Sequence, residues 1–169
     1  MVREITAFSN PLIKRMRMLR DKRRRREERL FLAEGLRILT EAREEGHLPR
    51  YLFFTRDTSD HRLVQPLVEQ TEASGGEAIE TSADILSKLS GKDNPGSVVG
   101  VYDELPTDLA RIDRDQAPLW LVAERLRDPG NLGTILRTAD AVGAGGLILI
   151  GECVDPFSVE AVRASMGAI

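Results

Sequence analysis

Two side chains in the C-terminal third of the chain have types and spacing suited to chemistry, namely Asn131 and Arg137. They lie in the segment 124–143, which reads ERLRDPGNLGTILRTADAVG and follows an apolar run. The Asp-Pro-Gly turn in this segment predicts that a strand ends and a helix begins, and open α/β sheets bind ligands at that end of a strand. The alternative is an ordinary turn with a capping asparagine and a surface arginine, and spacing alone favours this alternative.

The spacing of Asn131 and Arg137 restricts how the two side chains can act together. Six residues are about 1.7 helical turns, so the two do not share a helix face. If both contact one substrate, Asn131 does so from the loop end and Arg137 from the helix. The segment is neither a dinucleotide-binding fingerprint nor a phosphate-binding P-loop, since both glycine patterns are absent from the sequence.

A run of basic residues near the N-terminus is the second candidate site. Residues 1–30 hold 11 Lys and Arg against 4 Asp and Glu, whereas the other 139 residues hold 13 against 23. The net charge of −3 therefore hides a basic arm on an acidic body. Such an arm is typical of proteins that bind a polyanion such as RNA, although Glu27 and Glu28 also suit a solvated helix end. The candidate phosphate-binding side chains are Arg23, Arg24, Arg25 and Arg26.

Strand and helix signals alternate along the chain, which predicts an α/β fold. Apolar runs predict strands, and 3.6-residue periodicity with capping residues predicts helices. The predicted strands are 51–55, 78–79, 98–102, 119–123 and 147–150. The first predicted helix starts at Asn10-Pro11. The other predicted helices span 34–45, 60–73, 82–89, 131–142 and 158–168. A polar, proline-containing segment predicts a linker over 104–117 between an N-terminal unit, 1–103, and a second unit, 118–169.

The second unit reads β-α-β-α, which is a small core for a parallel sheet. Parallel sheets are normally covered on both faces and contain more strands. We therefore expect its apolar side chains to lack part of their cover. The side chains concerned are Leu121, Ile135, Leu147, Leu149 and Val162.

The composition excludes several classes of protein. Of 169 residues, 41% are hydrophobic and 30% charged, which argues against a disordered, collagen-like or membrane protein. No apolar stretch approaches the roughly 20 residues that span a bilayer, and the N-terminus has no apolar signal core. A single cysteine, Cys153, rules out an intrachain disulfide and fits a cytoplasmic location. His47 and His61 stand alone, so no metal site is expected.

Several segments resemble the signatures of one enzyme family. Residues 121–143 are similar to the first signature of the SpoU (TrmH-type) RNA ribose methyltransferases, and 161–169 (AVRASMGAI) resemble the start of the second. Residues 10–35 and 94–101 (NPGSVVGV) look like the start and the close of the family's N-terminal substrate-binding region. The resemblance covers nearly the whole chain, and the first signature is long and specific.

The resemblance implies methyl transfer from S-adenosylmethionine to a ribose 2′-hydroxyl of RNA. The resemblance favours ribosomal (23S-type) RNA, because the separate N-terminal unit resembles that branch, and leaves transfer RNA as the alternative. The second unit would be the first half of a knotted (SPOUT-type) α/β domain, and the full-length protein a homodimer. Asn131 would position the ribose, Arg137 would be the catalytic arginine and Glu124 would support them. Because its pKa exceeds about 12, an arginine is a poor general base, so we expect Arg137 to bind a phosphate and orient the hydroxyl.

The sequence departs from the family pattern because it ends at Ile169, within the second signature. The third signature, the knot and the cofactor contacts are expected in a continuation, so no cofactor-binding residue is assigned. On this interpretation the chain is an inactive fragment of a methyltransferase of about 260 residues. The alternatives are a non-catalytic RNA-binding module and, more weakly, a small-ligand α/β domain unrelated to RNA. The RNA species and the modified nucleotide stay open.

Overall fold

A computed structural model of the chain describes residues 2–113, 115 and 117–169. The chain forms two compact units, Met1–Glu104 and Leu105–Ile169. We call them unit 1 and unit 2. The predicted linker includes residues 114 and 116, which lie outside the described residues. The predicted α/β class is confirmed, since both units combine helices with strands.

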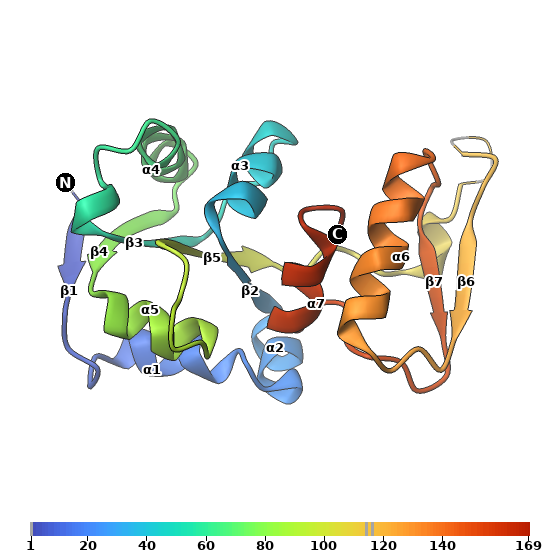
Figure 1. The fold of residues 1–169 in the computed structure, drawn as a ribbon, viewed down its shortest axis with the longest axis horizontal. Coiled ribbons are helices and arrows are strands. Elements are labelled where there is room, and N and C mark those ends of the chain that lie inside the picture. Colours follow the sequence, from blue (N-terminus) through green and yellow to red (C-terminus); the bar gives the residue numbers. More distant parts are fainter. Residues whose placement is uncertain (1, 114, 116) are drawn as a thin grey trace. The chain divides into compact units, whose positions relative to one another are not determined.

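Unit 1 is built on a mixed five-stranded sheet with the strand order β1-β4-β3-β5-β2. The first three strands in this order run parallel, and β5 pairs antiparallel with both β3 and β2. The strands are β1 (Arg3–Ile5), β2 (Leu30–Glu34), β3 (Tyr51–Thr55), β4 (Glu77–Thr81) and β5 (Val98–Asp103). Figure 1 shows this sheet between two layers of helices.

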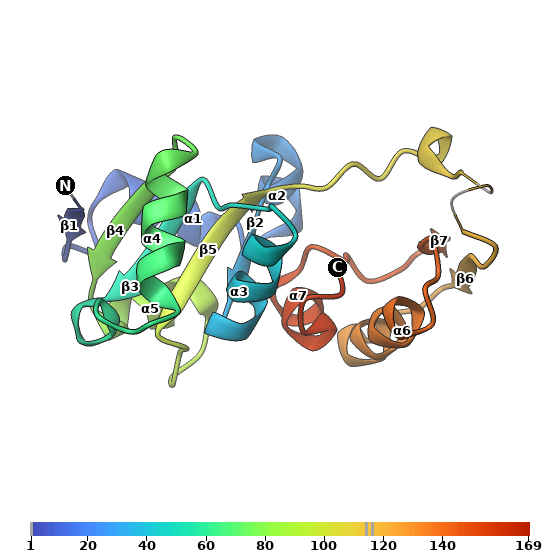
Figure 2. The ribbon, with the colours of Figure 1, turned by 90° about the horizontal axis from the view of Figure 1, so that it is seen from above.

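Helices cover both faces of the unit 1 sheet. The views in Figures 1 and 2 place α3 and α4 on one face and α1, α2 and α5 on the other. The helices are α1 (Pro11–Met18), α2 (Lys22–Glu28), α3 (Leu36–Glu44), α4 (Val64–Ala73) and α5 (Ala83–Ser90), with a 3-10 turn at Arg56–Thr58. Because both faces are covered, the middle strand β3 is largely apolar, and Leu52 and Phe53 are fully buried.

Unit 2 has a two-stranded parallel sheet and two helices. Its elements are a 3-10 turn (Leu109–Arg111), β6 (Leu121–Glu124), α6 (Pro129–Ala141), β7 (Leu147–Ile150) and α7 (Val159–Ser165). In the register, Leu121 pairs with Leu147 and Glu124 with Ile150. Helix α6 packs closely on α7 at Gly133, where an added Cβ would lie 2.3 Å from the carbonyl carbon of Ala164.

The expectation that unit 2 lacks apolar cover is correct for its strands and wrong for Val162. Leu121, Leu147 and Leu149 are half-buried, as is Ile135. Val162 is fully buried. The difference arises because α7 packs on α6, whereas the strands pair only with each other among the residues described.

Most predicted elements form, and three short ones appear that the sequence pattern did not predict, namely β1, β2 and α2. Strands 51–55 and 147–150 have the predicted bounds. Strand β1 is only three residues long, too short for a period-2 pattern. The arginine run forms α2, because the Asp21 side chain accepts hydrogen bonds from the N–H groups of Arg23 (2.9 Å) and Arg24 (3.2 Å). The predicted helix 60–73 starts only at Val64, which places Pro66 in its first turn, where a proline is tolerated.

Among the residues that the structure describes, no helix is long and apolar enough to cross a membrane.

Candidate functional site

The first candidate site lies at the carboxyl edge of the unit 2 sheet, where β6 and β7 end and α6 begins (Figure 1). Backbone hydrogen bonds tie the two loops of this edge together. The N–H of Arg125 donates to the carbonyl of Ile150 (2.9 Å), and the N–H of Val154 donates to that of Leu126 (2.7 Å). Arg125 has a left-handed φ of 52°, so the chain turns away from the sheet directly after Glu124. The two loops at this edge are therefore held together by backbone hydrogen bonds.

Helix α6 begins at this edge with Asp128 as its cap. The Asp128 side chain accepts a hydrogen bond from the N–H of Asn131 (2.7 Å), and Pro129 occupies the first helical position. The predicted capping role of Asn131 is therefore wrong, because the helix starts two residues earlier than predicted. Asn131 lies in the first turn of α6 with an exposed side chain. Its carboxamide is consequently available to a ligand, beside the partial positive charge of a helix N-terminus.

Arg137 lies further along α6 than Asn131. Six residues correspond to about 9 Å along the helix axis and about 120° around it. Both side chains are exposed, and within the described residues the Arg137 guanidinium makes no hydrogen bond or ion pair. The two groups therefore do not touch each other, and a ligand that contacts both has to wrap over the first turns of α6.

Glu124 ends β6 at the same edge, and its side chain is 68% exposed. Its nearest cation is Arg125, with 3.9 Å between Nε and Oε1. At that distance and exposure the pair is weak, so the Glu124 carboxylate stays accessible. The structure thus brings Glu124 and Asn131 to one edge and places Arg137 on the helix that leaves it.

The exposed edge does not by itself fit the S-adenosylmethionine that the resemblance implies. Sites for such ligands are concave and bury most of the ligand surface. Here the side chains of Glu124 and Glu152 are 68% and 90% exposed. We therefore assign no residue of this chain to the cofactor. Within the described residues, no group of three or more His, Cys, Asp or Glu side chains could hold a metal ion.

The second candidate site is α2. Of its four predicted phosphate-binding arginines, three are exposed and one is buried. Arg23 and Arg24 share the Glu27 carboxylate, at 2.7 Å and 2.8 Å. The hydrogen bond with Glu27 raises the pKa of Arg23, and the same bond lowers the pKa of the Glu27 carboxyl. Arg26 is exposed on the same helix. These three side chains face solvent, and together with Glu27 they leave a local excess of positive charge.

Arg25 departs from the prediction because it is buried, with 2% of its surface exposed. Its guanidinium donates to the carbonyls of Leu19 (2.8 Å) and Arg20 (2.9 Å). These carbonyls follow the end of α1, where backbone acceptors have no partner inside the helix. Arg25 therefore joins α1 to α2 and is not presented to a phosphate. Its side-chain direction depends on the packing of α1, so the sequence alone does not distinguish it from its neighbours.

Unit 1 also contains a buried carboxylate that the sequence pattern does not predict. Glu34, at the end of β2, is only 6% exposed. Its Oε1 accepts a hydrogen bond from the N–H of Gly96 (2.8 Å), and its Oε2 lies 3.8 Å from the Lys92 ammonium. A buried carboxylate needs such partners, so Glu34 fixes the loop before β5 against the end of β2. The only signal in the sequence is an acidic residue that ends an apolar run.

Both units match described protein families. Residues 10–100 match the "MRM3-like substrate binding domain" family. Residues 118–169 match the "SpoU rRNA Methylase family".

Individual relatives extend these matches over most of the chain. It is 36% identical over 167 residues to an uncharacterized tRNA/rRNA methyltransferase of Synechocystis sp., covering 99% of this chain and 60% of the relative. It is 34% identical to a 23S rRNA (uridine(2479)-2'-O)-methyltransferase of Streptomyces viridochromogenes, over 89% of this chain and 51% of that protein. An AdoMet-bound rRNA methyltransferase structure from Sinorhizobium meliloti superposes with a TM-score of 0.87 at 40% identity, covering 99% and 61% of the two chains. The chain thus spans about half to three fifths of the length of these relatives.

Proposed function

The chain belongs to the SpoU family of RNA methyltransferases, with an MRM3-like substrate-binding domain ahead of the methylase segment, and from this premise we propose that its parent protein methylates ribose 2′-hydroxyls of ribosomal RNA. The observation that carries the proposal is the placement of segment 124–143 at the carboxyl edge of β6, with Glu124, Asn131 and Arg137 all exposed. The names of the relatives support a ribosomal substrate. S-adenosylmethionine is the proposed methyl donor, the cytoplasm the proposed location and a homodimer the proposed full-length assembly.

In this proposal Asn131 and Arg137 act on the RNA. The Asn131 carboxamide holds the target ribose at the start of α6, and Glu124 supports it from the end of β6. Arg137 lies about 9 Å further along the helix axis, and its long side chain reaches a phosphate of the RNA strand that wraps over the first turns of α6. An arginine keeps its proton at neutral pH, so it orients the 2′-hydroxyl through the phosphate and does not remove the proton. Holding the attacking oxygen in line is a large part of what such a site contributes to rate.

The exposed cations of α2 supply a second, sequence-independent contact with the RNA. Arg23, Arg24 and Arg26 carry this role, and Arg25 is excluded because it is buried. Replacing the three exposed arginines with Gln should weaken RNA binding and flatten its salt dependence. An unchanged salt dependence would remove α2 from the RNA footprint.

The function is tested by methyl incorporation. The complete reading frame that contains this chain is expressed and incubated with S-adenosyl-[methyl-³H]methionine and ribosomal RNA, and the RNA is digested to nucleosides. The expected label is in 2′-O-methylated nucleosides, and the 169-residue chain assayed in parallel is expected to give none. Label in a methylated base would overturn the proposed reaction. RNA binding without any label from the complete protein would favour a non-catalytic RNA-binding module.

The role of Arg137 is tested by Arg137→Lys in the complete protein. Lysine keeps the charge but loses the planar fork that grips a phosphate with two hydrogen bonds. We expect turnover to fall by about 10-fold or more, in keeping with the loss of a charge-assisted hydrogen bond. Turnover equal to that of the unsubstituted protein would contradict an orienting role.

A further inference from the structure

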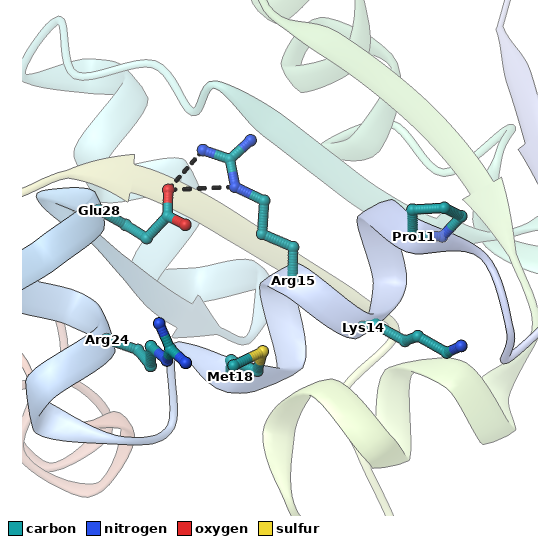
Figure 3. A pocket seen from close by; sticks show the side chains of 6 residues that line it. All are labelled: Pro11, Lys14, Arg15, Met18, Arg24 and Glu28. Carbon is teal, nitrogen blue, oxygen red and sulfur yellow. Dashed lines mark hydrogen bonds and ion pairs between the residues drawn. The ribbon is translucent and has the colours of Figure 1, made fainter.

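A pocket on unit 1 lies between α1 and α2, outside the methylase segment. It has a volume of about 330 Å³ and is lined by Pro11, Lys14, Arg15, Met18, Arg24 and Glu28. We call it the α1–α2 groove (Figure 3). The four lining residues from α1 are spaced i, i+3, i+4 and i+7, which places them on one stripe of the helix. The buried stripe of α1 is different, with Ile13 and Met16 facing the core.

The charged residues of the groove are not all neutralised. Arg15 forms an ion pair with Glu28. The Nε and Nη2 groups of Arg15 both donate hydrogen bonds to Oε2 of Glu28, and the Nε–Oε2 distance is 3.1 Å. Arg24 shares Glu27 with Arg23, so two guanidinium groups balance one carboxylate. Within the described residues, Lys14 has no hydrogen bond or ion pair. The groove therefore presents two cationic positions, Lys14 and Arg24, beside a closed ion pair.

An apolar side chain stands between the two cations. Met18 is 42% exposed although it is apolar, and Figure 3 shows it between Arg24 and Lys14, with Pro11 beyond Lys14 at the N-terminal end of α1. A thioether interacts favourably with aromatic rings, and bases have such faces. An apolar platform flanked by cations matches the chemistry of an unpaired nucleotide, which has an aromatic base and a phosphate on each side. A duplex does not offer the base face, because its bases are stacked inside.

We propose that the α1–α2 groove binds one unpaired RNA nucleotide, with its base on Met18 and its flanking phosphates on Lys14 and Arg24. The inference rests on the proposed RNA function and deepens it, because it assigns single-strand preference to unit 1. The Arg15–Glu28 pair forms the wall of the groove and holds α1 against α2. The base contact is sequence-tolerant, since every base has an aromatic face.

The test measures binding of fluorescein-labelled 12-nucleotide oligouridine and of a 12-base-pair RNA duplex to the 169-residue chain by anisotropy between 50 and 200 mM KCl. The double variant Lys14→Gln/Arg24→Gln should make the negative slope of log K against log[salt] for the single strand shallower by about 1.4, or 0.7 per lost phosphate contact. The matched control Arg37→Gln/Arg62→Gln removes the same charge from exposed positions outside the groove and should leave the slope unchanged.

The base contact is tested by Met18→Ala. We expect about a two- to tenfold loss of affinity for the single strand, the range of a thioether–aromatic contact, with no change in the salt slope or in duplex binding. The control Leu109→Ala, at a 67% exposed position in unit 2, should change neither affinity.

The outcomes distinguish a failure of the groove proposal from a failure of the proposed RNA binding. If the unsubstituted chain binds RNA but the groove variants behave like their controls, the groove proposal is overturned and RNA binding stands. Equal losses for single strand and duplex with Met18→Ala also overturn it. If the unsubstituted chain binds neither RNA, both the groove and RNA binding by this chain are wrong.

Discussion

Strand β3 in unit 1 and strand β7 in unit 2 have similar apolar sequences but different surroundings. In β3, four of five residues are buried, because neighbouring strands flank it and helices cover both sheet faces. In β7, three residues are half-buried and Ile150 is 49% exposed. The same kind of apolar run thus stabilises unit 1 strongly and unit 2 weakly. Unit 1 is therefore organised by its core, whereas unit 2 is organised by the α6–α7 contact and an exposed sheet edge.

The largest expected effect breaks the core of unit 1. Phe53→Ala removes a fully buried ring, and we expect the free energy of unfolding to fall by about 3–5 kcal/mol. Val122→Ala in β6 removes a side chain that is 60% exposed and should cost about 0.5 kcal/mol or less. Urea unfolding followed by far-UV circular dichroism checks both values. Similar losses for the two variants would contradict the contrast between the units.

The next effect concerns the helix contact of unit 2. In Gly133→Ala the new Cβ would lie 2.3–2.6 Å from Ala164 backbone atoms, so α7 has to shift. We expect a loss of about 1–3 kcal/mol, although alanine is the better helix former by about 1 kcal/mol. Trp120 is the chain's only tryptophan and lies in unit 2, so its fluorescence follows this transition. Thr134→Ala, at the exposed neighbouring position, is the control, and an equal shift there would argue against the helix contact.

Two adjacent arginines of unit 1 are expected to have different roles, one in stability and the other in RNA binding. Arg25→Gln leaves the carbonyls of Leu19 and Arg20 without their buried donor, and we expect a loss of about 1–3 kcal/mol. Arg26→Gln removes the same charge from the surface and should change the stability by about 0.5 kcal/mol or less. RNA binding at matched folded concentration should fall for Arg26→Gln. If Arg26→Gln destabilised the chain as much as Arg25→Gln, the buried role of Arg25 would be wrong.

The smallest expected effect is a pH dependence of unit 1 stability. The hydrogen bond from Arg15 lowers the pKa of the Glu28 carboxyl below its ordinary value near 4.5. A lowered pKa in the folded state means that the stabilisation is present above about pH 4.5 and is lost as the pH falls through the lowered value. The pair is partly exposed, so we expect about 0.5 kcal/mol or less. Urea midpoints at pH 6 and pH 3 for the unsubstituted chain and Glu28→Gln should converge at low pH, and a constant difference would contradict the assignment.

Much of the fold follows from local sequence patterns. Asn10-Pro11 predicted the start of α1, and the Asn10 side chain does accept a hydrogen bond from the N–H of Leu12 (2.9 Å). The apolar runs of β3 and β7 set their bounds because turn residues flank them. Strand order is different, since β1 pairs with β4 over more than 70 residues of intervening sequence. No local pattern contains that pairing.

For the candidate site, too, some features follow from the sequence and others only from the fold. The sequence by itself determined the family, and its resemblance to the family's first signature made Glu124, Asn131 and Arg137 the candidate site residues. Only the tertiary structure decided that Asp128 rather than Asn131 caps α6, and that Arg25 is buried while Arg23, Arg24 and Arg26 face solvent. The physical reason is that residue type and spacing are local properties. The availability of a side chain depends on which backbone groups and helices the fold brings next to it.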